Sequence, residues 1–113
     1  MSEQKQIIEK LYYSIGEVAD MFQMNTSKIR FWEKEFDILQ PKKNAKGERR
    51  YTKEDITTLR LIYYLVEEKG HTLEGARQKI KNNPQGENKN AEIVHKLKKI
   101  KEYLLALKRE IDL

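Results

Sequence analysis

The chain has 113 residues, a formal net charge of +5 and no cysteine, and 36% of its residues are charged. This length allows one domain of ordinary size, and the lack of cysteine excludes a disulfide framework, thiolate metal ligation and a thiol redox switch. No stretch approaches the ~20 apolar residues of a membrane helix and the amino terminus carries no secretory signal, so we expect a cytoplasmic protein whose basic balance is compatible with nucleic acid or an anionic membrane surface.

The first predicted helix opens at a capping box. The Ser14 hydroxyl can accept a hydrogen bond from the third helical amide, and the Glu17 carboxylate can accept one from the Ser14 amide. Apolar residues follow at helical spacing, namely Ile15, Val18, Ala19 and Phe22. Before this helix, residues 1–11 predict either a short helix or a loose arm, and residues 12–13 a brief strand.

A second helix is predicted directly after a short turn. Asn25 is a favourable N-cap, and the helix should run over residues 26–35. Ile29, Trp32 and Phe36 recur at steps of three and four, so we expect them to form its buried face. Two helices joined by so short a turn predict a helix-turn-helix.

A basic hairpin is predicted between Pro41, which cannot continue a helix, and Tyr51. Asn44 and Gly47 are its turn formers. Between Lys42 and Lys53 there are six basic residues and a single acid. A solvated loop tip is the common explanation of such a cluster, whereas DNA phosphates would match its charge, because each neutralised phosphate releases counterions.

Further helices are predicted from residue 52 to Gly70, which is placed to end a helix, and from Thr72 onward, with Leu73, Ala76 and Ile80 as apolar residues. The polar residues 83–90, with Pro84 and Gly86, predict a linker. A last helix should follow over residues 91–111. Its apolar residues are spaced 4, 3, 4, 3 and 4 apart, which is a heptad seam: Ile93, Leu97, Ile100, Leu104, Leu107 and Ile111.

The seam has two interpretations. It predicts a dimerising coiled coil, since a helix of ~20 residues is ~30 Å long, close to the spacing of DNA half-sites one turn apart. The alternative is an amphipathic helix that folds back on its own domain.

A helix-turn-helix followed by a basic hairpin is suited to duplex DNA. The second helix would enter the major groove by its amino-terminal half, and the hairpin would contact phosphates. The candidate DNA-binding residues on the helix are Asn25, Thr26, Ser27, Lys28 and Arg30. Those on the hairpin are Lys42, Lys43, Lys46, Arg49 and Arg50.

Three ordered motifs resemble the MerR family of bacterial transcription regulators. The opening YSIGEVA of residues 13–19 is similar to the family's Y-x-I-G-E-[VL]-A. The sequence KIRFWE of residues 28–33 is similar to its [TS]-[LI]-R-[YF]-[YW]-E, with lysine in place of the hydroxyl residue. The sequence PKKNAKGERRY of residues 41–51 is similar to its wing, P-x-R-x-x-x-G-Y-R-x-Y, with Glu48 in place of a tyrosine, and Thr52 to Asp55 match the following [ST]-x-x-D.

The resemblance implies a mainly α fold: a winged helix-turn-helix over residues 12–82, a linker over 83–90 and a dimerisation helix over 91–113. It implies backbone contacts by Arg30, Lys43, Arg49 and Tyr51, and Ser14 is added to the candidate DNA-binding set. Relatives of this kind are homodimers joined by an antiparallel coiled coil. They bind an inverted repeat in a promoter and distort its spacer so that RNA polymerase can engage.

Other functions are weighed against this one. An architectural or recombination-accessory DNA binder, similar to excisionases, would use a related winged helix, and a protein-interaction module would use the seam alone. No arrangement pairs a nucleophile with a base, so we expect no enzyme. We also expect no metal, cofactor or sensed effector, because His71 and His95 lack ligand spacing and the chain ends shortly after the seam.

Overall fold

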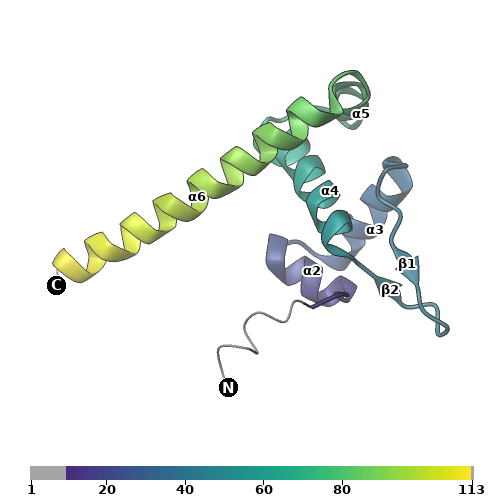
Figure 1. The fold of residues 1–113 in the computed structure, drawn as a ribbon, viewed down its shortest axis with the longest axis horizontal. Coiled ribbons are helices and arrows are strands. Elements are labelled where there is room, and N and C mark those ends of the chain that lie inside the picture. Colours follow the sequence, from purple (N-terminus) through teal and green to yellow (C-terminus); the bar gives the residue numbers. More distant parts are fainter. Residues whose placement is uncertain (1–9, 113) are drawn as a thin grey trace. The chain divides into compact units, whose positions relative to one another are not determined.

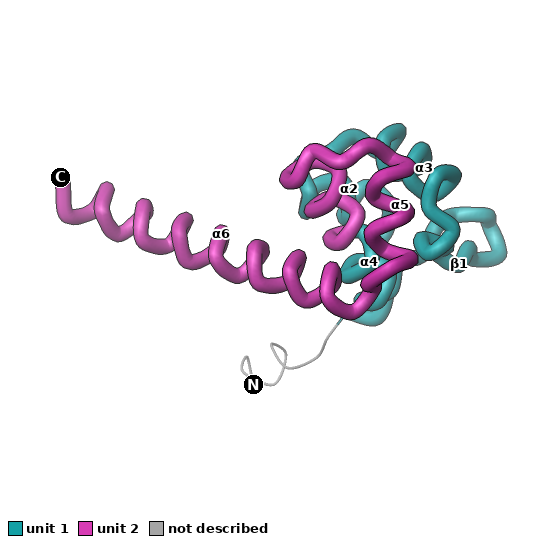
Figure 2. The backbone as a smooth tube through the Cα atoms, turned by 90° about the horizontal axis from the view of Figure 1, so that it is seen from above, with its two compact units in different colours: residues 1–59 teal, residues 60–113 magenta. Residues whose placement is uncertain are grey.

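The computed structural model describes residues 10–112, so the arm predicted over residues 1–11 lies almost entirely outside the described residues. The chain divides into two compact units, residues 1–59 and 60–113, with the boundary inside helix α4 (Lys53–Tyr63) (Figure 2). Each unit is described by itself. In the described part of the chain, no helix is both long and apolar enough to cross a bilayer.

The first unit begins with the predicted helix-turn-helix, α2 (Ile15–Phe22) and α3 (Thr26–Glu35) (Figure 1). The capping box is present: the Glu17 amide donates to the Ser14 hydroxyl at 3.2 Å, and the Ser14 amide donates to Glu17 Oε1 at 3.1 Å. The Lys28 amide donates to Asn25 Oδ1 at 2.8 Å, which confirms Asn25 as the N-cap of α3. Both helix starts are therefore set by local side-chain caps.

The turn between the two helices depends on a left-handed residue. Gln23 closes α2 with φ of 52°, and its amide donates back into the last turn of that helix. The Met24 amide donates to the Ala19 carbonyl at 2.9 Å. These bonds satisfy carbonyls that a helix end would otherwise leave open, and they reverse the chain within three residues.

The basic hairpin is a two-stranded antiparallel wing, β1 (Lys42–Lys43) and β2 (Arg49–Arg50), with Lys42 opposite Arg50. Asn44 organises the tip, because its side-chain carbonyl accepts from the Lys46 amide at 3.0 Å and the Glu48 amide at 2.9 Å. Gly47 has φ of 82°, a backbone conformation that residues other than glycine rarely adopt. The sequence-predicted turn formers therefore occupy the positions that need them.

Apolar side chains from α2, α3, the start of α4 and the segments on either side of the wing fill the core of the first unit. The largest fully buried ones are Val18, Ile29, Trp32, Phe36, Leu39, Tyr51 and Leu59. Tyr51 also pairs with Tyr13 as an isolated antiparallel bridge, with both N–H···O distances at 2.9 Å. Of the brief strand predicted at residues 12–13 only this bridge at Tyr13 is present, and it joins the end of the wing to the segment before α2.

The second unit differs from expectation at the end of its first helix. The α-helical part of α4 ends at Tyr63, and η1 (Tyr64–Glu68) is a π-helical turn in which the Lys69 amide donates to the Tyr64 carbonyl at 2.8 Å. Gly70 ends the segment with φ of 75°, as predicted. The next helix, α5 (Leu73–Asn82), starts at the Thr72 cap, whose hydroxyl accepts from the Gly75 amide at 3.0 Å.

The expected linker over residues 83–90 is wrong as secondary structure, because α6 (Pro84–Asp112) is a continuous helix of 29 residues. Asn83 caps it: its side-chain oxygen accepts from the Gly86 amide at 3.2 Å. Proline suits the first helical position, where its missing N–H would have no intrahelical partner. A proline-and-glycine stretch that looks like a linker is thus a helix start.

Helix α6 packs against α5 and η1, and its buried residue lies in its amino-terminal half. Ala91 is buried there with Leu65, Ala76 and Ile80 in the core of the second unit. The ammonium of Lys98 lies 2.7 Å from a carboxylate oxygen of Glu68 on η1. From residue 96 to residue 112 every side chain of α6 is exposed, and in the second unit the contact given for this stretch is the Lys98–Glu68 ion pair; Figure 2 shows the helix in the colour of that unit.

Candidate nucleic-acid interface

The solvent face of α3 is polar and cationic apart from one ring. Its exposed residues are Ser27, Arg30, Phe31 and Lys34. At 100° per residue these four lie on the side of the helix opposite Ile29 and Trp32, which are buried. Arg30 donates to the Thr26 hydroxyl at 3.4 Å. The amino end of α3 therefore presents donors, acceptors and positive charge without disturbing its packed side.

Two predicted residues at this end are partly committed to the fold. The Asn25 side-chain oxygen accepts the capping bond described above, which leaves its amide nitrogen for an outside acceptor. The Lys28 ammonium lies 5.5 Å from the centre of the Trp32 ring, within the range of a cation–π interaction. Both side chains remain at the helix start, where a helix-turn-helix approaches base edges.

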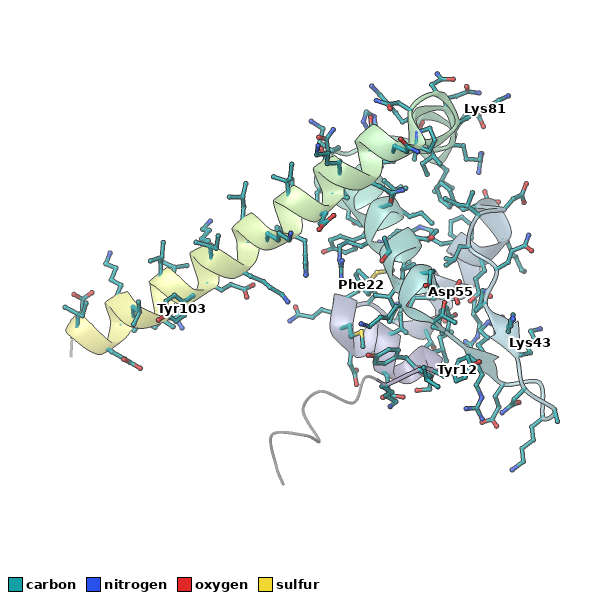
Figure 3. All side chains as sticks on the ribbon, in the orientation of Figure 1. Tyr12, Phe22, Lys43, Asp55, Lys81 and Tyr103 are labelled. Atoms are coloured by element: carbon teal, nitrogen blue, oxygen red, sulfur yellow. The ribbon has the colours of Figure 1, made fainter. Side chains whose placement is uncertain are left out.

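The wing presents a cluster of exposed positive charge. Lys42, Lys43, Lys46 and Arg50 are all exposed, and Lys43 is labelled on β1 in Figure 3. Among the described residues, no carboxylate pairs with any of these four. Positive charge on a short hairpin without internal partners is suited to an external polyanion.

Arg49 differs from these cations, because a carboxylate on α3 holds it. Its Nε donates to Glu33 Oε1 at 2.8 Å and Oε2 at 3.0 Å. The Tyr51 hydroxyl donates to the same carboxylate. The side chains of Arg49 and Glu33 are only 24% and 14% exposed, so the pair is shielded from water. Glu33 therefore fixes the second strand of the wing against α3.

The electrostatics of this cluster follow from its geometry. Hydrogen bonding to Glu33 raises the pKa of Arg49, and burial, followed by the hydrogen bond to Glu33, raises the pKa of Tyr51. Tyr51 is fully buried. This placement argues against the direct phosphate contact expected for Tyr51 and favours a positioning role, because its hydroxyl is inside the fold and already engaged.

Glu33 is the functional residue that sequence reasoning missed. It stood in the KIRFWE motif without an assigned role. The available signal was its position beside the buried Trp32, where a carboxylate needs a cation from elsewhere in the chain.

A shallow cavity of about 290 Å³ lies beside the wing, lined by residues before and at the start of α2 and by wing residues. Arg50 Cζ lies 5.9 Å from the centre of the Tyr12 ring. Lys10 pairs with Glu17, which together with the Ser14 amide lowers the pKa of that carboxyl. Ser14 lines this cavity together with Arg49 and Arg50, and its hydroxyl is used by the capping box.

The predicted dimerisation residues form a separate exposed set on α6. Ile93, Leu97, Ile100, Leu104, Leu107 and Ile111 are between 37% and 82% exposed. A row of large apolar side chains this exposed is unusual in a folded chain and marks an interaction surface.

In the part of the chain that the structure describes, no group of three or more histidines or carboxylates is placed to hold a metal ion. His95 lies on α6, where burial, Arg60 and Lys99 lower its pKa. His71 follows the glycine that ends η1.

Comparison with known proteins decides the family. The family described as MerR HTH family regulatory protein matches residues 13–83, which is more than half of the chain. The chain belongs to the MerR helix-turn-helix family. It is thus a DNA-binding transcription regulator of a non-enzymatic family, with a wing and a long C-terminal helix, as the sequence motifs predicted.

Solved structures show the same fold. A crystal structure of HiNmlR, a MerR family regulator lacking the sensor domain and bound to promoter DNA, has 20% identity and a TM-score of 0.55, over 89% of this chain and 88% of that one. A MerR family regulator from Bacillus thuringiensis has 22% identity and a TM-score of 0.51, over 89% and 97%. One from Bacillus cereus has 20% identity and 0.55, over 88% and 79%. No curated protein sequence matches the chain.

Proposed function

We propose that this MerR family protein regulates transcription in the cytoplasm by binding an inverted repeat in promoter DNA as a homodimer. In each copy α3 enters the major groove, the wing contacts the flanking phosphates and α6 joins the two copies. RNA polymerase is the further partner, engaging the promoter that the dimer has distorted.

The observation that carries the proposal is that only one of the five wing cations is paired with Glu33, while the other four are exposed. Arg49 is bound to Glu33 and holds the wing to α3. The other four, Lys42, Lys43, Lys46 and Arg50, are exposed without a carboxylate partner among the described residues. A rigid scaffold that leaves its cations uncompensated beside the exposed face of α3 is suited to a duplex, whose phosphates flank the groove.

The homodimer is supported by the seam on α6. Burying it requires a second apolar surface, and an identical helix supplies one of matching length and spacing. An antiparallel alignment pairs all six residues: Ile93 with Ile111 of the partner subunit, Leu97 with Leu107 of the partner subunit, and Ile100 with Leu104 of the partner subunit. The seam is ~27 Å long at 1.5 Å per residue, comparable with one turn of DNA.

Charges beside the seam favour the antiparallel order. In that alignment Lys96 lies near Glu110 of the partner subunit, and this attraction occurs twice by symmetry. A parallel alignment instead brings Lys96 near Lys101 of the partner subunit, a repulsion that also occurs twice. In the antiparallel alignment one repulsion between like charges remains, because Lys101 faces Lys101 of the partner subunit at the centre of the interface.

The test is selection of bound sequences from a random duplex library by the full chain. We expect an enriched inverted repeat whose half-site centres are separated by whole turns of DNA. Enrichment of single, unpaired half-sites would contradict the homodimer. Recovery of the unenriched library would contradict sequence-specific regulation.

A further inference from the structure

Phe31 is an exposed aromatic ring on the otherwise polar face of α3. It is 47% exposed, whereas its neighbours on the packed side, Ile29 and Trp32, are at 0% and 1%. The ring therefore adds little to the core of the first unit.

The neighbours of Phe31 on this face are suited to DNA rather than to another protein. Ser27 precedes it by four residues and so lies one helical turn away on the same line. Arg30 and Lys34 flank it, and both are exposed. A protein-binding site built around a phenyl ring would be expected to surround it with further apolar groups, and α3 has no other exposed apolar residue.

The chemistry of the ring limits what it can recognise. A phenyl group has neither a hydrogen-bond donor nor an acceptor, so it cannot bond a phosphate or a polar base edge. In the major groove, the apolar group that distinguishes one base from another is the 5-methyl of thymine.

We propose that Phe31 is a specificity-determining residue that packs against a thymine methyl group in the major groove of each half-site. This inference rests on the proposed function. Ser27 and Arg30 would read polar edges or phosphates on the same face, while Phe31 supplies the apolar part of the readout.

The test replaces each thymine of the selected duplex by uracil, one position at a time, and measures affinity at fixed salt. Uracil keeps the hydrogen-bonding groups of thymine and lacks only the methyl. For the wild-type chain we expect one thymine in each half-site at which the change weakens binding about fourfold, the value of one buried methyl-sized group.

Variants then show whether Phe31 is the partner of that methyl. Phe31→Ala should bind the thymine duplex about fourfold or more weakly, and should lose nothing further when uracil replaces the thymine. Met21→Ala is the matched control, because Met21 is 49% exposed but lies on α2. It should keep the uracil penalty. Thermal melting should shift little and to a similar extent in both variants, since the two side chains are exposed to nearly the same degree.

Several results would overturn the inference. A wild-type chain that binds every uracil duplex as tightly as the thymine duplex has no methyl contact. A uracil penalty that persists in Phe31→Ala assigns the methyl to another residue. In either case selective binding would remain, so the proposed function would stand; only a chain that selects no duplex would remove both.

Discussion

The first unit buries a core of large apolar side chains, whereas the carboxy-terminal half of α6 leaves such side chains exposed. In the first unit Trp32, Phe36 and Tyr51 are at most 1% exposed, and polar groups such as Glu33 have specific partners. On α6 Ile100 and Leu104 are 55% and 58% exposed, like Tyr103 at 65% (Figure 3). The first unit thus packs these side chains within itself, whereas α6 leaves a row of them exposed, which is the basis of the proposed homodimer.

The largest effect should come from a charge in the seam. Leu104→Asp would place a carboxylate in the dimer interface, at a cost of several kcal/mol, so the dimer dissociation constant should rise by on the order of 1,000-fold or more. Lys99→Asp, at an exposed position outside the seam, is the matched control and should leave the dimer intact. Light scattering reads out the mass. A monomeric wild type, or a dimeric Leu104→Asp, would show that the seam is not the interface.

Removing the carboxylate that holds the wing should act on the first unit instead. Glu33→Gln removes the negative charge and one of the two carboxylate oxygens that accept from Arg49 and the Tyr51 hydroxyl, and we expect the free energy of unfolding to fall by about 2 kcal/mol. Glu54→Gln, an exposed carboxylate on α4, should change it by less than ~0.5 kcal/mol. Urea titration measures both. Equal stability of the two variants would rule out the positioning role of Glu33.

The two adjacent arginines of β2 should then separate stability from DNA binding. Arg50→Gln should lower the salt dependence of DNA affinity by about one unit of slope without loss of stability, because Arg50 is exposed. Arg49→Gln should lose stability, by about 1 to 2 kcal/mol, because it breaks the contact with Glu33. Identical behaviour of both variants would contradict the assignment of one cation to the fold and the other to phosphate.

The smallest effect should be on the pH dependence of stability, through His95 on α6. Burial, Arg60 and Lys99 lower the pKa of His95 below 6.5, against the opposing charges of Glu68 and Glu102. The unfolded chain then takes up a proton more readily than the folded one. Stability is therefore full above about pH 6.5 and falls as the pH drops toward the folded-state pKa.

His95→Gln should remove this dependence between pH 7 and pH 5 in thermal melting curves. The carboxyls whose pKa is lowered, Glu17, Glu74 and Glu92, titrate at more acidic pH and do not obscure this window. An unchanged profile in the variant would exclude His95 as its source.

Local patterns in the sequence were sufficient for much of the first unit. The Ser14–Glu17 box and the Asn25 cap set helix starts by bonds between residues three apart, so α3 could be bounded correctly from sequence. Gly47 and Asn44 marked the wing in the same way. The family motifs at the start of α2 and in the wing include the capping and turn residues of those segments.

Features that depend on distant or competing contacts could not be read in this way. The bond of Glu33 with Arg49 joins residues 16 apart in sequence, and the burial of Tyr51 follows from the same packing. In a sequence, Pro84 is compatible either with a linker or with the first position of a helix. In the structure the side chain of the preceding residue, Asn83, caps the helix that starts there. The π-helical turn of η1 has no evident signal in the sequence.

The number of chains on one selected duplex tests the central claim most directly. Sedimentation of the wild-type protein with the full inverted repeat should give two chains per duplex, bound in a single step, while a duplex with one half-site binds far more weakly. One chain per full duplex would contradict the homodimer. An array that grows with duplex length would contradict the regulator and favour an architectural DNA binder.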